Sequence, residues 1–364
     1  MVKHGDRVHN KKIMIVLVTC SMLFAASFIS LTDENMVSAT SPIEITDSAG
    51  HQITLSAPAE HVVTMGFAFT LTVMELGGAD KIVGYDHYST YSYTEDERMQ
   101  ELDGIAELGT GYNSNKESLL TGLAQLVDNG NFTKATDVVF INNFSTTLAS
   151  GGMYDNLVAE GYNVICLGAK TYDGSIEVVE TISKAIGMDS ADSVKKMEDA
   201  RQAVVDRVAA VPGEERPSAI YVSVNGGSIR IYNSGLAVSL IETCGATNAC
   251  RNGESAYFNS DGSAIIQANP DVIFLDGTYN GTVEEFKEVF PSLASCNVVK
   301  LDKDWNNPCP GMAEGLEFVY VELYEAPLYD DGGAPISENS ALIAVSVLML
   351  VIIIAVAVVL VRRR

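Results

Sequence analysis

The sequence predicts an α/β protein in which one long α-helix bridges two lobes of mainly parallel sheet and a C-terminal transmembrane helix follows. Three observations predict this fold class. Short β-branched runs alternate with helical patterns in the first half, the alternation returns in the second half, and a long amphipathic pattern separates the halves. Strands that alternate with helices are typical of βαβ units and parallel sheets.

The two halves have similar patterns. In the first half, buried strands are expected at 61–65, 81–85, 137–142 and 163–168, with helices at 69–76, 116–127 and 152–160. In the second half, strands are expected at 218–224, 271–276 and 297–302, with helices at 237–244, 263–268 and 283–290. The runs DVVFIN (137–142) and DVIFLD (271–276) echo each other, which favours two lobes of like architecture, at 42–188 and 216–328.

Between the halves, residues 189–211 are expected to form a linking helix. Apolar residues recur at close to helical spacing, including Val194, Met197, Val204 and Val208. Asp189 or Ser190 can cap its start, and Pro212-Gly213 ends it. Because this stretch lacks a Gly- or Ser-rich linker, the lobes are expected to be joined by a stiff strut.

The C-terminus carries the pattern of a membrane span. Residues 341–361 form an unbroken apolar run in which Ser346 alone is polar. Such a run is long enough for a hydrocarbon core of roughly 30 Å. Arg362–Arg364 follow at once, and a basic cluster stays on the cytoplasmic side. We therefore expect a single-pass cell-membrane protein with its C-terminus in the cytoplasm, a linker at 329–340, and everything before it outside.

The N-terminus agrees with this orientation. Basic residues precede an apolar stretch from Ile13 to about Leu31, and Val37-Ser38-Ala39 offers small residues for cleavage. Residues 1–39 are therefore expected to be a signal peptide, with an uncleaved anchor as the alternative. Both versions export the middle of the chain.

Charge and cysteines limit the functions and bonds available to the exported part. The chain holds 23 Lys and Arg against 47 Asp and Glu, for a net charge of −24, so nucleic acid is a poor partner. The cysteines contain no CxxC pair, which argues against zinc-finger and thioredoxin sites. Cys166 is expected to be an unpaired core residue. Two disulfides are expected among Cys244, Cys250, Cys296 and Cys309, the nearest pairings being 244–250 and 296–309, although connectivity stays open.

The residues that follow the expected strands form the candidate ligand site. In open α/β sheets, ligands bind outside the carboxyl ends of the strands, so the cleft between two such lobes is the default site. Aromatic and amide side chains gather there, and this composition favours a large, flat or partly apolar ligand. The candidate ligand-binding residues are Phe67, Phe69, His87, Tyr88, Tyr91, Asn143, Phe144, Asn225, Arg230, Tyr232, Tyr279 and Trp305.

Catalytic motifs are missing from the sequence. It contains no G-x-S-x-G elbow, no Walker loop and no H-E-x-x-H pair. Of the exported histidines His51, His61 and His87, only His87 falls on a candidate site loop, and a bare transition-metal site needs two or three. We therefore expect neither an enzyme, nor a metal site, nor a resident cofactor.

Three stretches resemble one family of binding proteins. TDSAGHQITLSAPAEHVVTM (46–65), LGGADKIVGYDHYSTY (76–91) and ANPDVIFLD (268–276) are similar to the substrate-binding proteins of ABC importers for ferric siderophores, haem and vitamin B12. The match covers about residues 42–326. It implies a short β-hairpin at 43–55, two Rossmann-like lobes joined by a long helix, and a monomer that delivers a metal chelate to a permease and its ATPase.

The resemblance also implies roles for individual residues. Tyr88 and Tyr91 match aromatic pocket positions of the B12-binding members, and Asp304-Trp305 resembles the last pocket loop. Family members dock on permease arginines through an acidic residue on each lobe, which Glu117 matches in lobe one. In lobe two the position falls at Ser263, with Asp261 two residues away. An arginine common among siderophore binders is absent from DWNNPCPG, which leaves Arg230 as the expected cation of the pocket.

These observations lead to a membrane-anchored binding protein whose ligand is an iron chelate or a corrinoid. Its C-terminal anchoring is more like an archaeal arrangement than a bacterial lipoprotein. A surface receptor of the same fold without a transport partner is the alternative, motivated by Ser263, and another small ligand such as an oxyanion also stays open. An enzyme built around a metal cluster would need more cleft ligands than Cys166 and His87.

Overall fold

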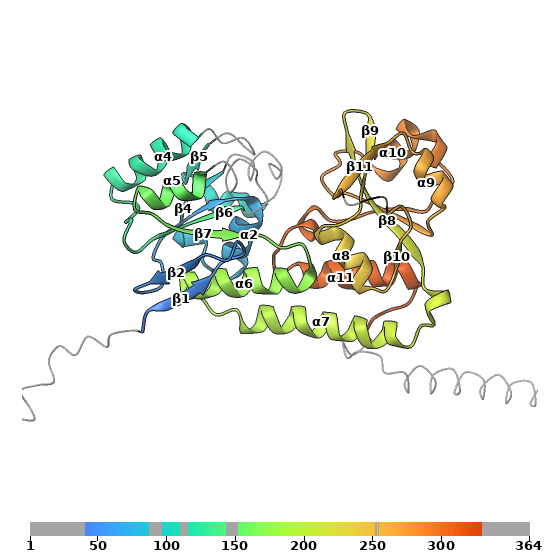
Figure 1. The fold of residues 1–364 in the computed structure, drawn as a ribbon, viewed down its shortest axis with the longest axis horizontal. Coiled ribbons are helices and arrows are strands. Elements are labelled where there is room, and N and C mark those ends of the chain that lie inside the picture. Colours follow the sequence, from blue (N-terminus) through green and yellow to red (C-terminus); the bar gives the residue numbers. More distant parts are fainter. Residues whose placement is uncertain are drawn as a thin grey trace, which may run out of the picture. The chain divides into compact units, whose positions relative to one another are not determined.

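The computed structural model describes residues 41–86, 97–109, 116–142, 152–251, 253 and 255–329 (Figure 1). The expected signal peptide, the expected transmembrane helix and the linker after Tyr329 lie outside these residues. Within the described ranges, no helix is both long and apolar enough to cross a membrane.

Lobe one begins with a β-hairpin and contains a wholly parallel sheet. Strands β1 (Ile43–Thr46) and β2 (Gln52–Leu55) pair antiparallel, as expected for 43–55. The parallel sheet has the order β5-β4-β3-β6-β7. Its strands are β3 (Val62–Met65), β4 (Ile82–Asp86), β5 (Ala106–Leu108), β6 (Val138–Asn142) and β7 (Asn163–Leu167). Its helices are α2 (Phe67–Glu75), α4 (Lys116–Asp128), α5 (Met153–Ala159) and α6 (Tyr172–Ile186).

Lobe two contains a mixed sheet with a parallel centre. The main path runs β11-β9-β8-β12-β13, and the short β10 pairs with the start of β8. Strands β8, β12 and β13 are parallel, whereas β9 and β11 continue the sheet in antiparallel fashion. The strands are β8 (Ser218–Asn225), β9 (Ser228–Tyr232), β10 (Thr247–Asn248), β11 (Tyr257–Ser260), β12 (Val272–Leu275) and β13 (Val298–Lys300). The helices are α8 (Leu236–Thr243), α9 (Ser263–Ala268), α10 (Val283–Val289) and α11 (Met312–Tyr324).

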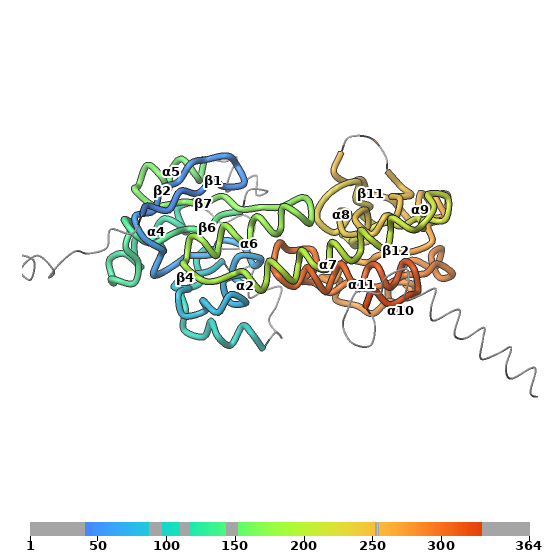
Figure 2. The backbone as a smooth tube through the Cα atoms, turned by 90° about the horizontal axis from the view of Figure 1, so that it is seen from below, coloured from blue at the N-terminus to red at the C-terminus, as the bar shows by residue number. Residues whose placement is uncertain are grey.

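The expected linking helix is present as α7 (Ala191–Ala209). Figure 2 shows α7 running beside α11, and its contacts reach α6, α8 and α11. Its buried residues include Met197 and Val208, and the hydroxyl of Tyr172 on α6 donates to the Met197 carbonyl at 2.9 Å. One buried apolar cluster includes side chains of α2, α6, α7, α8 and α11. The strut is therefore part of a continuous core, and the expected class of two mainly parallel sheets with one long helix is confirmed.

The expectation of two disulfides is wrong. All five cysteines of the described chain are free thiols. Cys244 and Cys309 lie in the apolar cluster that contains α7, α8 and α11. Cys250 and Cys296 lie in or against a separate cluster that contains Ile265 and Phe286. The residues of each expected pair are close in sequence but belong to different clusters, and a disulfide needs Cα atoms within about 7 Å. Cys166 is a buried, unpaired core residue, as expected.

Candidate functional site

The clearest candidate ligand surface lies on one face of β8, β9 and β11. Alternation along β9 buries Ile229 and Ile231 on one face and presents Ser228, Arg230 and Tyr232 on the other. In the ladder, Arg230 is opposite Ser223 of β8 and Asn259 of β11, and Tyr232 is opposite Tyr257. Residues directly opposite each other in antiparallel strands share a face. We call Tyr221, Ser223, Arg230, Tyr232 and Tyr257 the aromatic–arginine face.

Three tyrosines form a row across this face. The rings of Tyr221 and Tyr232 have centroids 5.1 Å apart, and those of Tyr232 and Tyr257 are 5.9 Å apart. The two hydroxyl oxygens of Tyr232 and Ser223 are 3.2 Å apart. The Tyr221 hydroxyl donates to Asp276, whose other carboxylate oxygen accepts from the Thr278 amide. Tyr221 is buried at the inner end of this row, whereas Tyr232 is half-buried and Tyr257 is exposed. The rings of Tyr232 and Tyr257 therefore offer the surface for stacking.

Arg230 supplies the positive charge of this face. Its guanidinium carbon lies 4.3 Å from the centroid of the Tyr257 ring, in cation–π contact. Its Nε atom is shielded from solvent and has no hydrogen-bond acceptor among the described residues. A buried donor without an acceptor costs free energy. Arg230 as a whole is half-buried, so a ligand would meet the accessible part of its side chain and not Nε. The face therefore suits a ligand with a π-surface and an oxygen acceptor.

A second cation, Arg98 on η2 (Glu97–Leu102), lies beside the expected pocket loop. Arg98 donates to Asp304 of η6 (Lys303–Asn306) at 2.7 Å, and it lies 3.6 Å from Glu75 at the end of α2. We call Glu75, Arg98 and Asp304 the Arg98 cluster. Burial raises the pKa of Glu75 to about 7; Arg98 opposes this rise, whereas Asp304 and Glu314 add to it.

Trp305 follows Asp304 and packs against Phe318 of α11, with ring centroids 4.9 Å apart. A Cβ at Gly315 would lie 2.6 Å from the indole, so glycine there makes room for the ring. The indole is only partly buried. Because Trp305 follows Asp304 in the chain, it offers accessible surface next to the Arg98 cluster.

The structure brings some expected site residues together and separates others. Arg230 and Tyr232 share the aromatic–arginine face, and Asn225 is exposed at the end of β8. Phe67 and Phe69 are buried in the core of lobe one, so neither offers a ring for stacking. Tyr279 packs edge-on against Phe286, which belongs to the cluster under the opposite face of the sheet. The expected site residues outside the described ranges are His87, Tyr88, Tyr91, Asn143 and Phe144.

Tyr257 and Arg98 were missed by the sequence analysis. Tyr257 lies on β11, whose four residues YFNS are too few and too mixed to give a strand signal on their own. Arg98 follows a tyrosine-rich stretch, and its partner Asp304 is 206 positions away. The alternation in SIRIY was the one signal that could have predicted β9 and its shared face.

The two expected docking acids are both on the surface. Glu117, in the first turn of α4, is exposed and borders a cavity of about 710 Å³ between α4 and β5. Asp261 is exposed just before α9, and its carboxylate accepts from the Ser263 amide at 3.0 Å. Hydrogen bonds from the Ser263 side chain and backbone lower the pKa of Asp261, which keeps it charged. Asp261 borders a second surface cavity lined by Ile266, Gln267 and Ser292.

Comparison with known proteins identifies the fold. No family model and no curated relative matches the sequence. Nickel-bound CeuE of Helicobacter pylori matches with 16% identity and a TM-score of 0.60, over 78% of this chain and 89% of that one. Molybdate-bound MolA of Haemophilus influenzae matches with 19% identity and a TM-score of 0.61, over 78% and 91%. The periplasmic haem-binding protein HutB of Vibrio cholerae matches with 17% identity and a TM-score of 0.54, over 72% and 98%.

At these identities the matches show the fold alone, and that fold is the two-lobed fold of periplasmic binding proteins. The resemblance seen in the sequence is thereby confirmed at the level of architecture. The three neighbours are described with different cargoes, which are nickel, molybdate and haem.

Proposed function

We propose that this protein is an extracytoplasmic substrate-binding protein of an ABC importer that captures a metal chelate and delivers it to a permease. The aromatic–arginine face is the observation that carries the proposal. The accessible rings of Tyr232 and Tyr257, beside the half-buried cation of Arg230, suit a ligand with a π-surface and oxygen acceptors. Ferric siderophores, cobalamin and haem have this chemistry. The protein acts as a binder and not as an enzyme.

The docking part of the proposal rests on Glu117 and Asp261. Each is exposed at the start of a helix, one on each lobe, and each borders a surface hollow. Paired acidic residues of this kind suit arginines on the outer face of a permease. The expected span at 341–361 would keep the protein at the membrane, close to its permease.

Ligand titration followed by tryptophan fluorescence tests the proposal. Trp305 is the single tryptophan of the chain and borders the Arg98 cluster. A soluble fragment of residues 40–340 would be titrated with cobalamin, haem and a ferric siderophore, with correction for absorbance by each ligand. Saturable quenching by one of them is expected. No saturable response to any of the three, in a fragment with native circular dichroism, contradicts the chelate proposal.

The role of the aromatic–arginine face is tested with a matched pair of variants. Arg230→Gln removes the charge and the cation–π contact, and it should weaken binding about tenfold or more, the equivalent of ~1.4 kcal/mol. Arg251→Gln is the control, because Arg251 is exposed and pairs with Glu242 on the surface. Equal affinities in the two variants would place the ligand elsewhere.

The second candidate function is a surface receptor or sensor of the same fold without a permease, motivated by Ser263 at the expected docking position. A Glu117→Arg change should abolish uptake if lobe one docks through this residue. Uptake that survives in a folded, displayed variant would exclude docking through Glu117. A third outcome, in which molybdate or another oxyanion binds and the chelates do not, would change the ligand class and leave the binding-protein function intact.

A further inference from the structure

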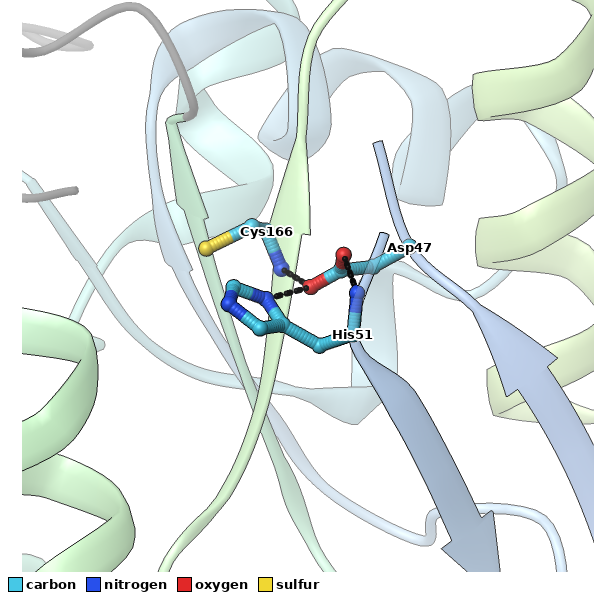
Figure 3. Close-up of side chains that lie close together, drawn as sticks. All are labelled: Asp47, His51 and Cys166. Carbon is cyan, nitrogen blue, oxygen red and sulfur yellow. Dashed lines mark hydrogen bonds and ion pairs between the residues drawn. The ribbon is translucent and has the colours of Figure 1, made fainter. Parts of the chain in front are cut away.

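We propose that Cys166 and His51 form a binding site for a soft monovalent cation, Cu(I), on lobe one, and that Asp47 orients it. Figure 3 shows the three side chains together. They come from the turn of the β1–β2 hairpin and from β7, and none of them belongs to the aromatic–arginine face or to the Arg98 cluster. The carboxylate, imidazole and thiol ligand atoms all lie within 4.8 Å of one another.

The Asp47 carboxylate is already fully occupied, so it orients the site and does not bind the metal. One oxygen accepts from the backbone amides of Ala49 and His51, each at 2.9 Å. The other oxygen accepts from the Cys166 amide at 2.9 Å and lies 2.9 Å from Nδ1 of His51. Four donors saturate a carboxylate, which offers about four acceptor positions.

This arrangement fixes the tautomer and the direction of His51. A buried carboxylate that accepts from Nδ1–H leaves Nε2 with a free lone pair, which is the form in which histidine binds metals. Tyr154 stacks on the imidazole with centroids 3.8 Å apart and an interplanar angle of 9°, which holds the ring in place. In Figure 3 the thiol of Cys166 lies on the side of the ring away from the Asp47 contact.

Within the described part of the chain, the two remaining ligand atoms have no other partner. Among the described residues, neither Nε2 of His51 nor Sγ of Cys166 takes part in a hydrogen bond, whereas the thiols of Cys244, Cys250 and Cys309 all donate to backbone carbonyls. Cys166 has no exposed surface, and about a third of the His51 side chain is accessible. An ion would therefore bind first at the accessible imidazole and reach the buried sulfur by a small displacement of the ring.

The number and softness of the ligands select the metal. Thiolate and imidazole together suit soft ions. Beside the occupied Asp47 carboxylate, the described residues offer two ligands here, fewer than the four that zinc takes in structural sites. A linear ion between them needs a sulfur–nitrogen separation of roughly 4.3 Å if zinc bond lengths are used as a guide. The Cys166 sulfur and a ring nitrogen of His51 lie within 4.8 Å of each other, a limit that is compatible with this separation. Binding would replace the thiol proton, which passes to solvent.

A catalytic role for the same three residues does not fit. Cysteine, histidine and aspartate in line can form a nucleophilic triad. Burial, together with the charge of Asp47, raises the pKa of Cys166 to about 12, so the thiol stays protonated and is a poor nucleophile. A sulfur without exposed surface is also out of reach of a substrate.

Copper binding to the full-length, detergent-solubilised protein tests the proposal. Cu(I) would be supplied under anaerobic conditions in competition with a chromogenic Cu(I) chelator, without thiol reductants. The native protein should hold one more equivalent of Cu(I) than the Cys166→Ser and His51→Gln variants. It should also show thiolate-to-copper absorbance in the near ultraviolet that both variants lack.

Two matched controls separate this site from general metal binding. His61 makes the same kind of contact with a buried aspartate, 3.2 Å from Asp137, but the only group of three potential ligands within the described residues is the one around His51. His61→Gln and Cys250→Ser should therefore keep the extra equivalent. If Cys166→Ser fails to fold, the copper content of His51→Gln tests the proposal, because that variant leaves the core thiol in place. Equal copper content in the native protein and in a folded His51→Gln or Cys166→Ser variant overturns the proposal.

Discussion

The Glu75→Gln substitution should stabilise the protein at pH 8 and have little effect at pH 5. The folded state raises the pKa of Glu75 from 4.5 to about 7, mainly by burial. A carboxyl with a raised pKa binds its proton more tightly in the folded chain than in the unfolded chain. The native protein therefore loses stability as the pH rises from about 4.5 through 7, and glutamine, which does not ionise, removes this loss.

The size of the effect follows from the same pKa change. A rise from 4.5 to about 7 corresponds to roughly 3 kcal/mol at pH values above both pKa values. The Glu75 side chain keeps 26% of its accessible surface, so solvent screening reduces this figure. We expect the free energy of unfolding of Glu75→Gln to exceed that of the native protein by about 1–2 kcal/mol at pH 8.

Urea unfolding of the 40–340 fragment at pH 5 and pH 8, followed by Trp305 fluorescence and circular dichroism, measures this difference. Glu180→Gln is the control, because Glu180 is exposed on α6 and its change should add nothing at either pH. A variant that is less stable than the native protein at pH 8 would show that Arg98 stabilises an ionised Glu75. The attraction between Arg98 and the Glu75 carboxylate would then outweigh the cost of burying its charge.

Three further outcomes are expected. Gly245→Ala should destabilise the protein by about 1–3 kcal/mol, because a Cβ there would lie 2.3 Å from Val208 of the strut. Gly253→Ala should cost less, because Gly253 also has a positive φ but has open space around it. Thermal unfolding of the two variants measures the difference. Thr282→Ala removes the side chain that accepts from the Glu285 amide in a capping box and should cost about 1 kcal/mol in the same assay. Thiol titration of the urea-unfolded 40–340 fragment without reductant should find every cysteine reactive, and a reductant should leave its unfolding midpoint unchanged, because the described thiols are all free.

The sequence predicted the buried elements well because their signal is local. Strands β3 and β12 are buried along their whole length. β12 appears as an unbroken apolar run, and β3 departs from this pattern only at Thr64. The strut α7 has both an apolar period and clear end signals. In contrast, β11 has no residue classed as fully buried and exists through its pairing with β9, so its own four residues carry little strand signal.

The candidate site was predicted only in part, because its contacts depend on tertiary structure. Arg230 and Tyr232 were found since they follow a strand that the sequence shows plainly. Tyr257 and Arg98 needed the pairing of β11 and a contact across 206 positions, and neither follows from a local pattern. The two expected disulfides failed for a related reason, since proximity in sequence does not reveal to which buried cluster each thiol belongs.

The contacts of the η6 turn indicate how a ligand at Trp305 would affect the rest of the protein. Asp304 pairs with Arg98 of lobe one, and the Thr72 hydroxyl of α2 donates to the Pro308 carbonyl at 3.2 Å. Asn306 accepts from the Ala237 amide at the start of α8. The turn is therefore tied to elements of both lobes and lies over the same continuous core that contains α7. Because displacing the segment 304–308 would break several of these bonds together, the ligand should be selected by the side chains that line the site more than by a large closing motion.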